Sequence, residues 1–192
     1  LKRRESYAKL VSKIYLFLGG NYMSKTTYKA AIMTGPRTIE FQDMPLTEPG
    51  HGEVLVKIKA VGICTWEQRF YTKDKQDYFP FWGGHEIAGI VEKIGPGVKN
   101  DLKVGDHVAI ASLTRCGECY FCRKGMDNQC LFAEAPVESD LPSGPRGFSE
   151  YIIARGYECC KVNPELPFAE AAISEPVACC TRSVRQCEVN FG

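Results

Sequence analysis

From residue 28 onward, apolar residues occur in short runs that Gly and Pro clusters interrupt. Runs of this kind, bounded by turn residues, are typical of strands. The predicted strands are Tyr28–Met33, Thr38–Asp43, Glu53–Val61, Ile87–Ile94 and His107–Ala111. Residues that restrict or free the φ angle lie where the chain must reverse, namely at Pro45, Pro49-Gly50, Gly95-Pro96-Gly97 and Gly105-Asp106. The pattern therefore predicts a β-rich, barrel-like body.

The pattern changes to helix toward the end of the chain. Ala135–Arg146 is polar and rich in Pro, which predicts a surface loop, and Gly147–Ala154 returns to strand character. One helix is predicted to begin at Pro167. A second is predicted to begin at Ser174, with Pro176 at an early helical position where its missing N–H would be unpaired anyway. The predicted fold class is mainly β with a few helices.

Length and composition are those of a globular protein. The 192 residues, 44% of them hydrophobic, suit one domain of ordinary size with an appendage. The net charge is +1, but residues 1–29 hold seven cations and one acid, which leaves the remainder at about −5. A mildly acidic body without a basic stripe or a base-stacking motif gives no support for nucleic-acid binding.

Cysteine usage and the first residues bear on location. Ten cysteines in an otherwise ordinary composition indicate a reducing compartment, and we expect the cytoplasm. Lys2-Arg3-Arg4 and the apolar run Ile14–Leu18 resemble a signal peptide, but the run is short and lacks a cleavage signal. We expect residues 1–22 to be a leader or disordered extension. No stretch approaches the roughly 20 apolar residues that span a bilayer, so no membrane partner is expected.

Four cysteines lie close together at metal-ligand spacing. Cys116, Cys119, Cys122 and Cys130 form a C-x2-C-x2-C-x7-C cluster. Thiolates crowded in this way would repel one another, whereas one Zn²⁺ takes four sulfurs in a closed tetrahedral site. The cluster therefore predicts a structural zinc lobe over residues 115–131.

Two other interpretations of this cluster stay open. The first three cysteines share the spacing of bacterial [4Fe–4S] sites, although Cys130 follows seven residues later rather than three and precedes Leu131 rather than Pro. The second is a pair of disulfides, but bridges between such close neighbours are strained and nothing else marks a secreted scaffold.

A second constellation is formed by Cys64, His85-Glu86 and Glu175, each at a predicted strand end or helix start. His85 follows Gly83-Gly84, where the missing side chains would let the backbone approach an ion. A thiolate, an imidazole and a carboxylate make a three-ligand zinc site with a fourth position for water or an alcohol. The structural alternatives are a buried cysteine and a carboxylate that complements a helix dipole.

Other residues of interest have simpler interpretations. His51 and His107 have no neighbouring ligand in the pattern, so we interpret both as structural. Seven aromatic residues lie between Cys64 and His85, and they either wall an apolar substrate pocket or pack a small subcore. They are Trp66, Phe70, Tyr71, Tyr78, Phe79, Phe81 and Trp82.

The order of these motifs resembles the N-terminal, GroES-like catalytic domain of zinc-dependent medium-chain alcohol and polyol dehydrogenases. The resemblance covers about residues 28–192. It rests on Gly62-Ile63-Cys64, Gly84-His85-Glu86-Ile87-Ala88-Gly89-Ile90-Val91, Gly95-Pro96-Gly97-Val98, Val104-Gly105-Asp106-His107-Val108, the four-cysteine cluster, Gly147-Phe148-Ser149-Glu150-Tyr151 and Glu175-Pro176.

The resemblance implies a catalytic zinc as well as the structural one, two per chain. Its ligands would be Cys64, His85 and Glu175, with Glu86 able to approach or bind the metal. Glu67 would orient His85. The Glu175-Pro176 form is similar to the sorbitol and threonine dehydrogenase branch, which favours polyols or secondary alcohols as substrates. The implied reaction is zinc activation of the hydroxyl and hydride transfer to NAD or NADP.

The chain departs from that family beside the first ligand. The family usually has a relay hydroxyl two residues after the cysteine, where this chain has Trp66, and Arg69 stands where a relay His often lies. Thr65 is an alternative relay. Equally, Arg69 could hold a carboxylate or phosphate of the substrate as a bidentate fork.

The family continues into a Rossmann domain, whose Gly-rich turn is absent from this sequence. We therefore expect a catalytic domain over residues 23–173 and a linking helix over 174–192. One hypothesis is a dehydrogenase fragment, inactive alone and homo-oligomeric at full length. The alternative is a free-standing zinc-binding module without activity.

Overall fold

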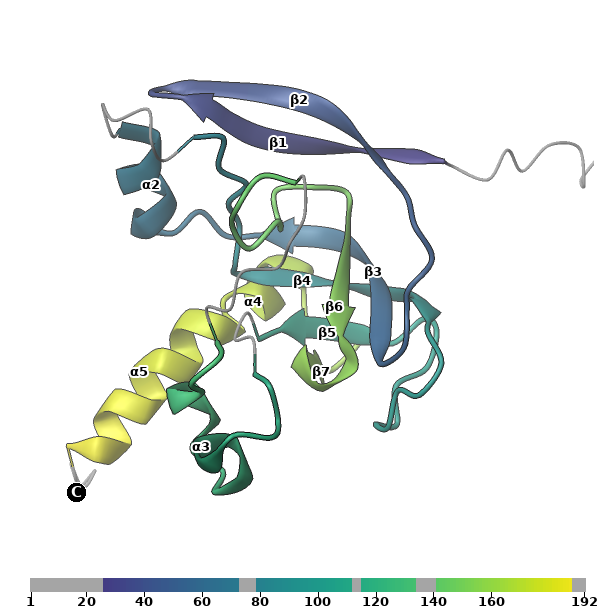
Figure 1. Cartoon of the computed structure of the whole chain (residues 1–192), viewed down its shortest axis with the longest axis vertical. Helices are drawn as coiled ribbons and strands as arrows, with labels where there is room; N and C mark the ends of the chain where they lie inside the picture. Colours follow the sequence, from purple (N-terminus) through teal and green to yellow (C-terminus); the bar gives the residue numbers. More distant parts are fainter. Residues whose placement is uncertain (1–25, 73–78, 112–114, 134–140, 188–192) are drawn as a thin grey trace, which may run out of the picture.

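The computed structural model describes residues 26–72, 79–111, 115–133 and 141–187. Its two sheets are the hairpin β1 (Thr27–Gly35) and β2 (Thr38–Pro45), and a five-stranded sheet of order β6-β3-β4-β5-β7. The latter contains β3 (Glu53–Val61), β4 (Ile87–Ile94), β5 (His107–Ile110), β6 (Tyr151–Arg155) and β7 (Cys159–Lys161). All paired strands are antiparallel, and the hairpin arches over the larger sheet (Figure 1).

The mainly β, barrel-like fold predicted above is confirmed. The observed bounds of β3 and β4 are the predicted ones, because turn residues flank both strands and β-branched residues fill them. Several short elements were missed, among them α3 (Tyr120–Arg123) and the 3-10 helices η2 (Asp127–Gln129) and η3 (Gly156–Glu158). The helix α2 (Thr65–Thr72) follows Cys64, and its aromatic residues gave no helical period. Strand β7 has only three residues, too short to produce a pattern.

Two clusters of buried side chains position the loops of interest. The main cluster includes Val54, Val56, Ile87 and Val108 from the five-stranded sheet. The second lies under the hairpin and contains Ala30, Ile32, Met44 and Trp82. Burial of each large side chain contributes about 1.5–3 kcal/mol.

The backbones of Met33 and Phe81 exchange two hydrogen bonds of 2.9 Å. The hairpin therefore fixes the segment that leads to His85.

Helices α4 and α5 follow the last strand of the sheet in the sequence. Helix α4 (Phe168–Ala172) begins one residue after the predicted Pro167, and its Ala171 and Ala172 pack against Ala88 of the sheet. Helix α5 (Ser174–Gln186) begins at the predicted residue and projects away from the sheet (Figure 1). None of the described helices is long and apolar enough to cross a membrane. The expected extension 1–22 lies outside the described residues.

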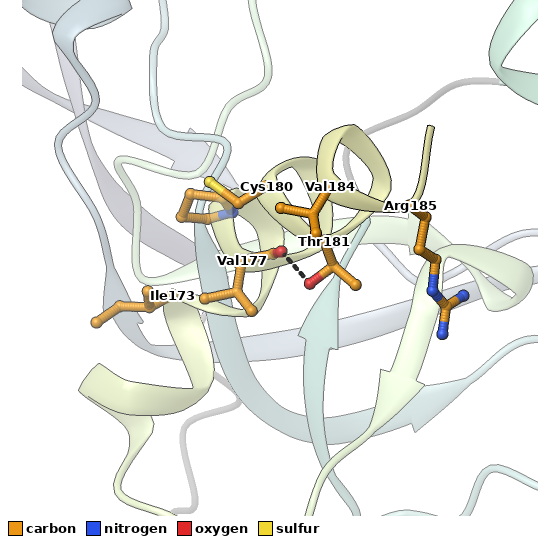
Figure 2. Close-up of a pocket in the computed structure, with 7 residues that line it drawn as sticks. Ile173, Val177, Cys180, Thr181, Val184 and Arg185 are labelled. Carbon is orange, nitrogen blue, oxygen red and sulfur yellow. Dashed lines mark hydrogen bonds between the residues drawn. The ribbon is translucent and has the colours of Figure 1, made fainter. Parts of the chain in front are cut away.

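One face of α5 carries apolar side chains that the described residues leave exposed. Ile173 and Val177 are 51% and 55% exposed, and with Val184 they line a shallow groove of about 580 Å³ (Figure 2). Thr181 donates a 2.8 Å hydrogen bond to the carbonyl oxygen of Val177, which keeps its hydroxyl along the helix. The face is therefore mainly apolar, with Arg185 at its far end.

Candidate metal centres

The four clustered cysteines converge on one point. Their sulfur atoms all lie within 4.8 Å of one another, and the Sγ atoms of Cys116 and Cys122 are 4.0 Å apart. A tetrahedral site with Zn–S bonds of 2.3 Å has sulfurs roughly 3.8 Å apart. The arrangement therefore fits one zinc ion. All ten cysteines of the chain are free thiols in the structure, so the disulfide alternative has no support from it.

Backbone N–H groups point at these sulfurs. Cys116 Sγ accepts from the amides of Glu118 and Cys119 at 3.4 and 3.2 Å. Cys130 Sγ accepts from Cys116 and Phe132 at 3.3 and 3.4 Å. Such donors stabilise the thiolate form, which is the form that binds metal.

The pKa values of these thiols are shifted in opposite directions by backbone N–H groups and by burial. Backbone N–H groups, first that of Cys122, lower the pKa of Cys119 to about 6, and the amide of Cys116 lowers the pKa of Cys130. Burial acts in the opposite sense on Cys122 and raises its pKa to about 12. The folded loop thus favours the thiolate at Cys119 at neutral pH and shifts Cys130 in the same direction.

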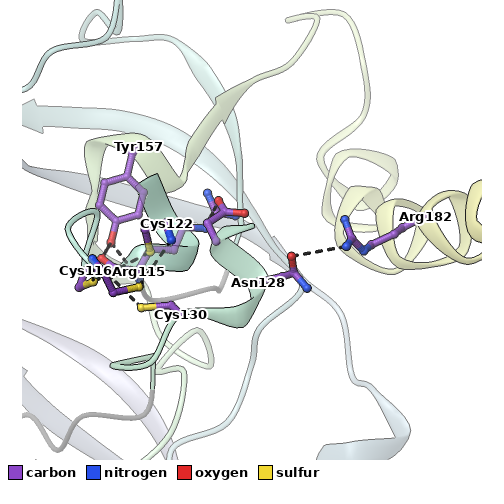
Figure 3. A network of polar contacts seen from close by, with 9 residues as sticks. Arg115, Cys116, Cys122, Asn128, Cys130, Tyr157 and Arg182 are labelled. Carbon is purple, nitrogen blue, oxygen red and sulfur yellow. Dashed lines mark hydrogen bonds and ion pairs between the residues drawn. The ribbon is translucent and has the colours of Figure 1, made fainter. Parts of the chain in front are cut away.

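Polar contacts fix the lobe to the rest of the molecule. Arg115 Nε pairs with Asp127 Oδ2 at 2.8 Å, and the Tyr157 hydroxyl donates to the carbonyl oxygen of Arg115 at 2.9 Å. Arg182 of α5 donates to Asn128 Oδ1 at 3.4 Å (Figure 3). The lobe is therefore tied to the turn between β6 and β7 through Tyr157 and to α5 through Arg182.

The second predicted group of ligands is assembled from three separate segments. Cys64 lies between β3 and α2, His85 lies just before β4, and Glu175 lies in the first turn of α5. Ligand atoms of Cys64, Glu67 and His85 are within 4.8 Å of one another, and so are those of His85, Glu86 and Glu175. The structure therefore places the other four predicted residues in two groups that share His85, and Cys64 and Glu175 do not belong to the same group.

Glu67 holds the His85 ring. Its side chain is fully buried, and its Oε1 lies 2.8 Å from His85 Nδ1 and accepts from the amide of Gly84 at 3.0 Å. A carboxylate acceptor selects the tautomer with hydrogen on Nδ1, which leaves the Nε2 lone pair for a metal. The other oxygen, Oε2, is buried and has no hydrogen-bond partner among the described residues.

Glycines and a thiol shape the rest of the site. A Cβ on Gly62 would overlap the Glu86 carboxylate, so glycine is needed there for Glu86 to reach the site. Glu175 Oε1 accepts a 3.6 Å hydrogen bond from Cys179, one turn later in α5. The sequence analysis did not predict the contact of Cys179 with Glu175. The spacing of four residues indicates it only when both residues are known to lie in one helix.

The glycines before His85 have a different role from the expected one. Gly84 has φ of 94°, and a Cβ there would collide with the backbone of Gly147 and Phe148. Gly84 therefore permits close packing against residues 147–150, which precede β6; the strand predicted from Gly147 begins only at Tyr151.

The aromatic residues divide between the two predicted roles. Phe81 and Trp82 are buried in the core, at 3% and 1% exposure, whereas Trp66 is 42% exposed. The Trp66 ring lies 5.6 Å from the His85 ring and 5.4 Å from the Phe81 ring. Trp66 is thus beside the candidate metal site. Tyr78 lies outside the described residues.

The two remaining histidines make structural contacts. The His51 ring lies against Gly97, where a Cβ would overlap it, and the His107 ring packs on Phe168 at 4.6 Å. Neither belongs to a group of possible metal ligands among the described residues.

Comparisons with known proteins agree with this geometry. Residues 50–164 match the alcohol dehydrogenase GroES-like domain. Sorbitol dehydrogenase of Bacillus subtilis (strain 168) is 35% identical over 77% of this chain and 42% of its own length. NDMA-dependent alcohol dehydrogenase of Amycolatopsis methanolica is 35% identical over 64% of this chain and 34% of its own.

A solved structure adds the cofactor of a relative. Acetophenone reductase from Geotrichum candidum NBRC 4597, in complex with NAD, is 31% identical with a TM-score of 0.70 over 86% of this chain and 49% of its own. The chain therefore belongs to the alcohol dehydrogenase GroES-like domain family, a family of oxidoreductases. It spans between a third and a half of the length of these relatives.

Proposed function

We propose that this chain is the metal-binding catalytic part of a zinc-dependent, NAD(P)-linked dehydrogenase that oxidises a secondary alcohol or polyol. The observation that carries the proposal is the position of His85, which belongs to both groups of possible ligands and is held through Nδ1 by Glu67. Such a hydrogen bond to the distal nitrogen is characteristic of metal-binding histidines. Sorbitol dehydrogenase among the relatives supports the substrate class.

In this proposal each residue has a definite task. Cys64, His85 and Glu175 hold zinc, and Glu86 is a further carboxylate within reach. Bound zinc would supply Lewis-acid chemistry that lowers the pKa of a substrate hydroxyl. Glu67 sets the direction of the His85 ring, and Cys179 restrains the Glu175 carboxylate. Of the six cysteines outside the lobe, all except Cys64 and Cys179 have no role in metal binding in this proposal.

We assign the proton acceptor beside the metal to Thr65. Trp66 occupies the position of the expected relay hydroxyl and its indole cannot accept a proton. The Thr65 Oγ1 lies 4.0 Å from Cys64 Sγ, so a hydroxyl is present at the first ligand after all. Trp66 would instead contact the carbon substituents of the alcohol, since its exposed ring lies beside His85.

The nicotinamide would be bound by a part of the protein that this chain does not contain. The exposed apolar face of α5, with Ile173 and Val177, supports this assignment, because such a face is normally covered by another structural unit. Full-length relatives are at least twice as long as the match. We also propose a homo-oligomer at full length.

Elemental analysis of the zinc-loaded chain tests the proposal. We expect two zinc ions per chain, one of which a brief chelator wash removes, because an open three-ligand site exchanges more readily than a closed one. His85→Gln should lose only the exchangeable ion, and the control His51→Gln should keep both. After Co²⁺ replaces the exchangeable ion, its absorption spectrum should shift on addition of an alcohol.

Other outcomes would favour a different function. A single chelator-resistant zinc would leave a free-standing zinc-binding module as the better description. Iron with acid-labile sulfide would contradict zinc in the lobe. A cobalt spectrum insensitive to alcohols would contradict an open coordination position.

A further inference from the structure

The outer edge of the β1–β2 hairpin has no partner strand among the described residues. Strand β1 has neighbours on both sides, because it pairs with β2 along one edge and exchanges backbone hydrogen bonds with Phe81 and residues 148–150 along the other. Strand β2 pairs with β1 alone in the described part of the chain, and it lies outermost in Figure 1. One edge of β2 therefore presents backbone N–H and C=O groups that no other described strand uses.

This edge lacks most of the features that keep exposed strands apart. Proteins commonly protect an edge with a short strand, a bulge, a lysine or a proline. Strand β2 has eight residues and no lysine, and its only proline is the last residue, Pro45. The one irregularity in its pairing with β1 lies at the turn, between Met33 and Gly35. Residues 38–44 can therefore accept a further antiparallel strand.

Two large apolar side chains of β2 are exposed to solvent. Phe41 is 75% exposed and Ile39 is 48% exposed. Because the two residues are separated by one position in a strand, their side chains project from the same face. Phe41 is the most exposed of the large hydrophobic residues that the structure describes. An apolar pair on an unpaired edge is typical of a surface that another strand covers.

The side chains of β2 are complementary to a second copy of the same strand. If two copies pair antiparallel about a two-fold axis at Phe41, the two Phe41 rings face each other and Glu40 lies opposite Gln42 on the other face. Aromatic pairs and hydrogen-bonding pairs are favourable directly across an antiparallel ladder. Asp43, the other acidic residue of β2, is already paired with Lys29 at 2.7 Å.

Neighbouring registers are less favourable. An axis at Glu40 would pair Ile39 with Phe41, but it would bring two Glu40 carboxylates directly opposite each other, which is destabilising. An axis at Gln42 would place each Phe41 opposite Asp43. The axis at Phe41 places Ile39 opposite Asp43, and it avoids opposing like charges. Self-pairing is therefore best centred on Phe41.

We propose that two copies of this chain associate through β2, which joins their hairpins into a four-stranded antiparallel sheet across a two-fold axis at Phe41. A second copy fits this edge because each favourable pair is made by the strand with itself. The association goes beyond the proposed function, which names no contact surface, and it requires neither metal nor dehydrogenase chemistry. A contact of this size should have a dissociation constant of about 1–100 µM.

Sedimentation velocity of the zinc-loaded chain tests the association. Over protein concentrations of about 1–200 µM we expect a reversible equilibrium between monomer and dimer. Phe41→Lys should weaken the dimer at least about tenfold, because it replaces an aromatic pair with two opposed like charges. The matched control is Val104→Lys, which places the same charge at another side chain that is 65% exposed, and it should associate as the parent does.

Position 42 tests the register. Gln42→Glu would set a carboxylate opposite Glu40 in both copies and should weaken the dimer about tenfold. Gln42→Lys would set a cation there and should strengthen the dimer about threefold. Circular dichroism should be the same for all variants, since the strand is exposed. Equal affinities of the two position-42 variants would overturn the axis at Phe41.

Hydrogen exchange locates the contact. Amides of residues 38–45 should exchange at least about threefold more slowly at high protein concentration than at low, and Phe41→Lys should remove this difference. The competing surface is the exposed face of α5, so Val177→Lys should leave the dimer unchanged. A chain that stays monomeric at about 200 µM would overturn the proposal. So would a dimer that Val177→Lys disrupts and Phe41→Lys does not. Neither result would alter the expected zinc content, which tests the proposed function separately.

Discussion

The two candidate metal centres are built in opposite ways. The lobe takes four sulfurs from one short segment and surrounds them with that segment's own amides. The site at His85 takes its ligands from three places that only the sheet and α5 bring together. A local site of this kind can form with the loop and stabilises it, whereas a site assembled from distant segments requires the fold to exist first. The comparison favours a structural role for the four-cysteine lobe and a functional role for the site at His85.

The largest expected effect comes from removing a lobe ligand. Cys119→Ser should abolish the tightly held zinc and cost about 5 kcal/mol or more of local folding free energy, because metal binding supplies much of the stability of such loops. Hydrogen exchange over residues 115–133, with zinc analysis, measures this. The exposed Cys160→Ser is the matched control and should change neither quantity. A Cys119→Ser chain with full zinc and unchanged exchange would break the comparison.

Glu67 gives the next largest effect, and it acts on the other site. Glu67→Ala leaves the amide of Gly84 and His85 Nδ1 without their buried acceptor, which should cost about 3 kcal/mol and lower Tm by about 6–12 °C. Affinity for the exchangeable metal should fall about 10–100-fold. Glu67→Gln keeps an acceptor oxygen and should recover most of the stability.

The Glu67 result also has a clear contradicting outcome. Thermal unfolding and competitive chelator titration should change together in Glu67→Ala while the lobe zinc stays bound. Loss of the lobe zinc in this variant would show that the two centres fold as one unit.

Acid should affect the metal-free lobe in a defined range of pH. The pKa of Cys119 is about 6 in the folded lobe against an ordinary 9.0. Because the folded pKa is the lower one, the stabilisation is complete above about pH 9 and is lost as pH falls through 6. Thiolate absorbance of the metal-free chain should therefore show a step near pH 6 that is missing in Cys119→Ser. A first thiolate step near pH 9 would contradict the hydrogen-bonded lobe.

The smallest expected effect concerns the contact between the two centres. Arg182 of α5 reaches Asn128 of the lobe through one exposed hydrogen bond of 3.4 Å. Arg182→Ala should cost no more than about 0.5–1 kcal/mol and leave both metal affinities within about twofold. Chemical unfolding and metal titration check this, with Arg185→Ala as the control. A large fall in affinity at the His85 site would instead couple the lobe to Glu175 through α5.

The sequence alone predicted features that depend on neighbouring residues. The bounds of β3 and β4 followed from turn residues beside β-branched runs, and the start of α5 followed from Pro176. The four-cysteine cluster was recognisable because all its ligands lie within one loop, where spacing restricts geometry. For the second site, the positions of Cys64, His85, Glu86 and Glu175 at predicted strand ends and helix starts only indicated a possible group of ligands, and the resemblance to a family assigned their roles, since nothing local relates Cys64 to Glu175.

Only the tertiary structure decided how distant residues meet. It placed Glu67 on His85, Cys179 on Glu175, and the backbone of Gly84 against Phe148. It also turned Trp82 into the core with an unpaired N–H and left Trp66 beside the candidate metal site. Short-range patterns carry the information for strands, turns and a metal loop. Contacts between segments depend on strand order and packing, which emerge only when the whole sheet closes under its hairpin.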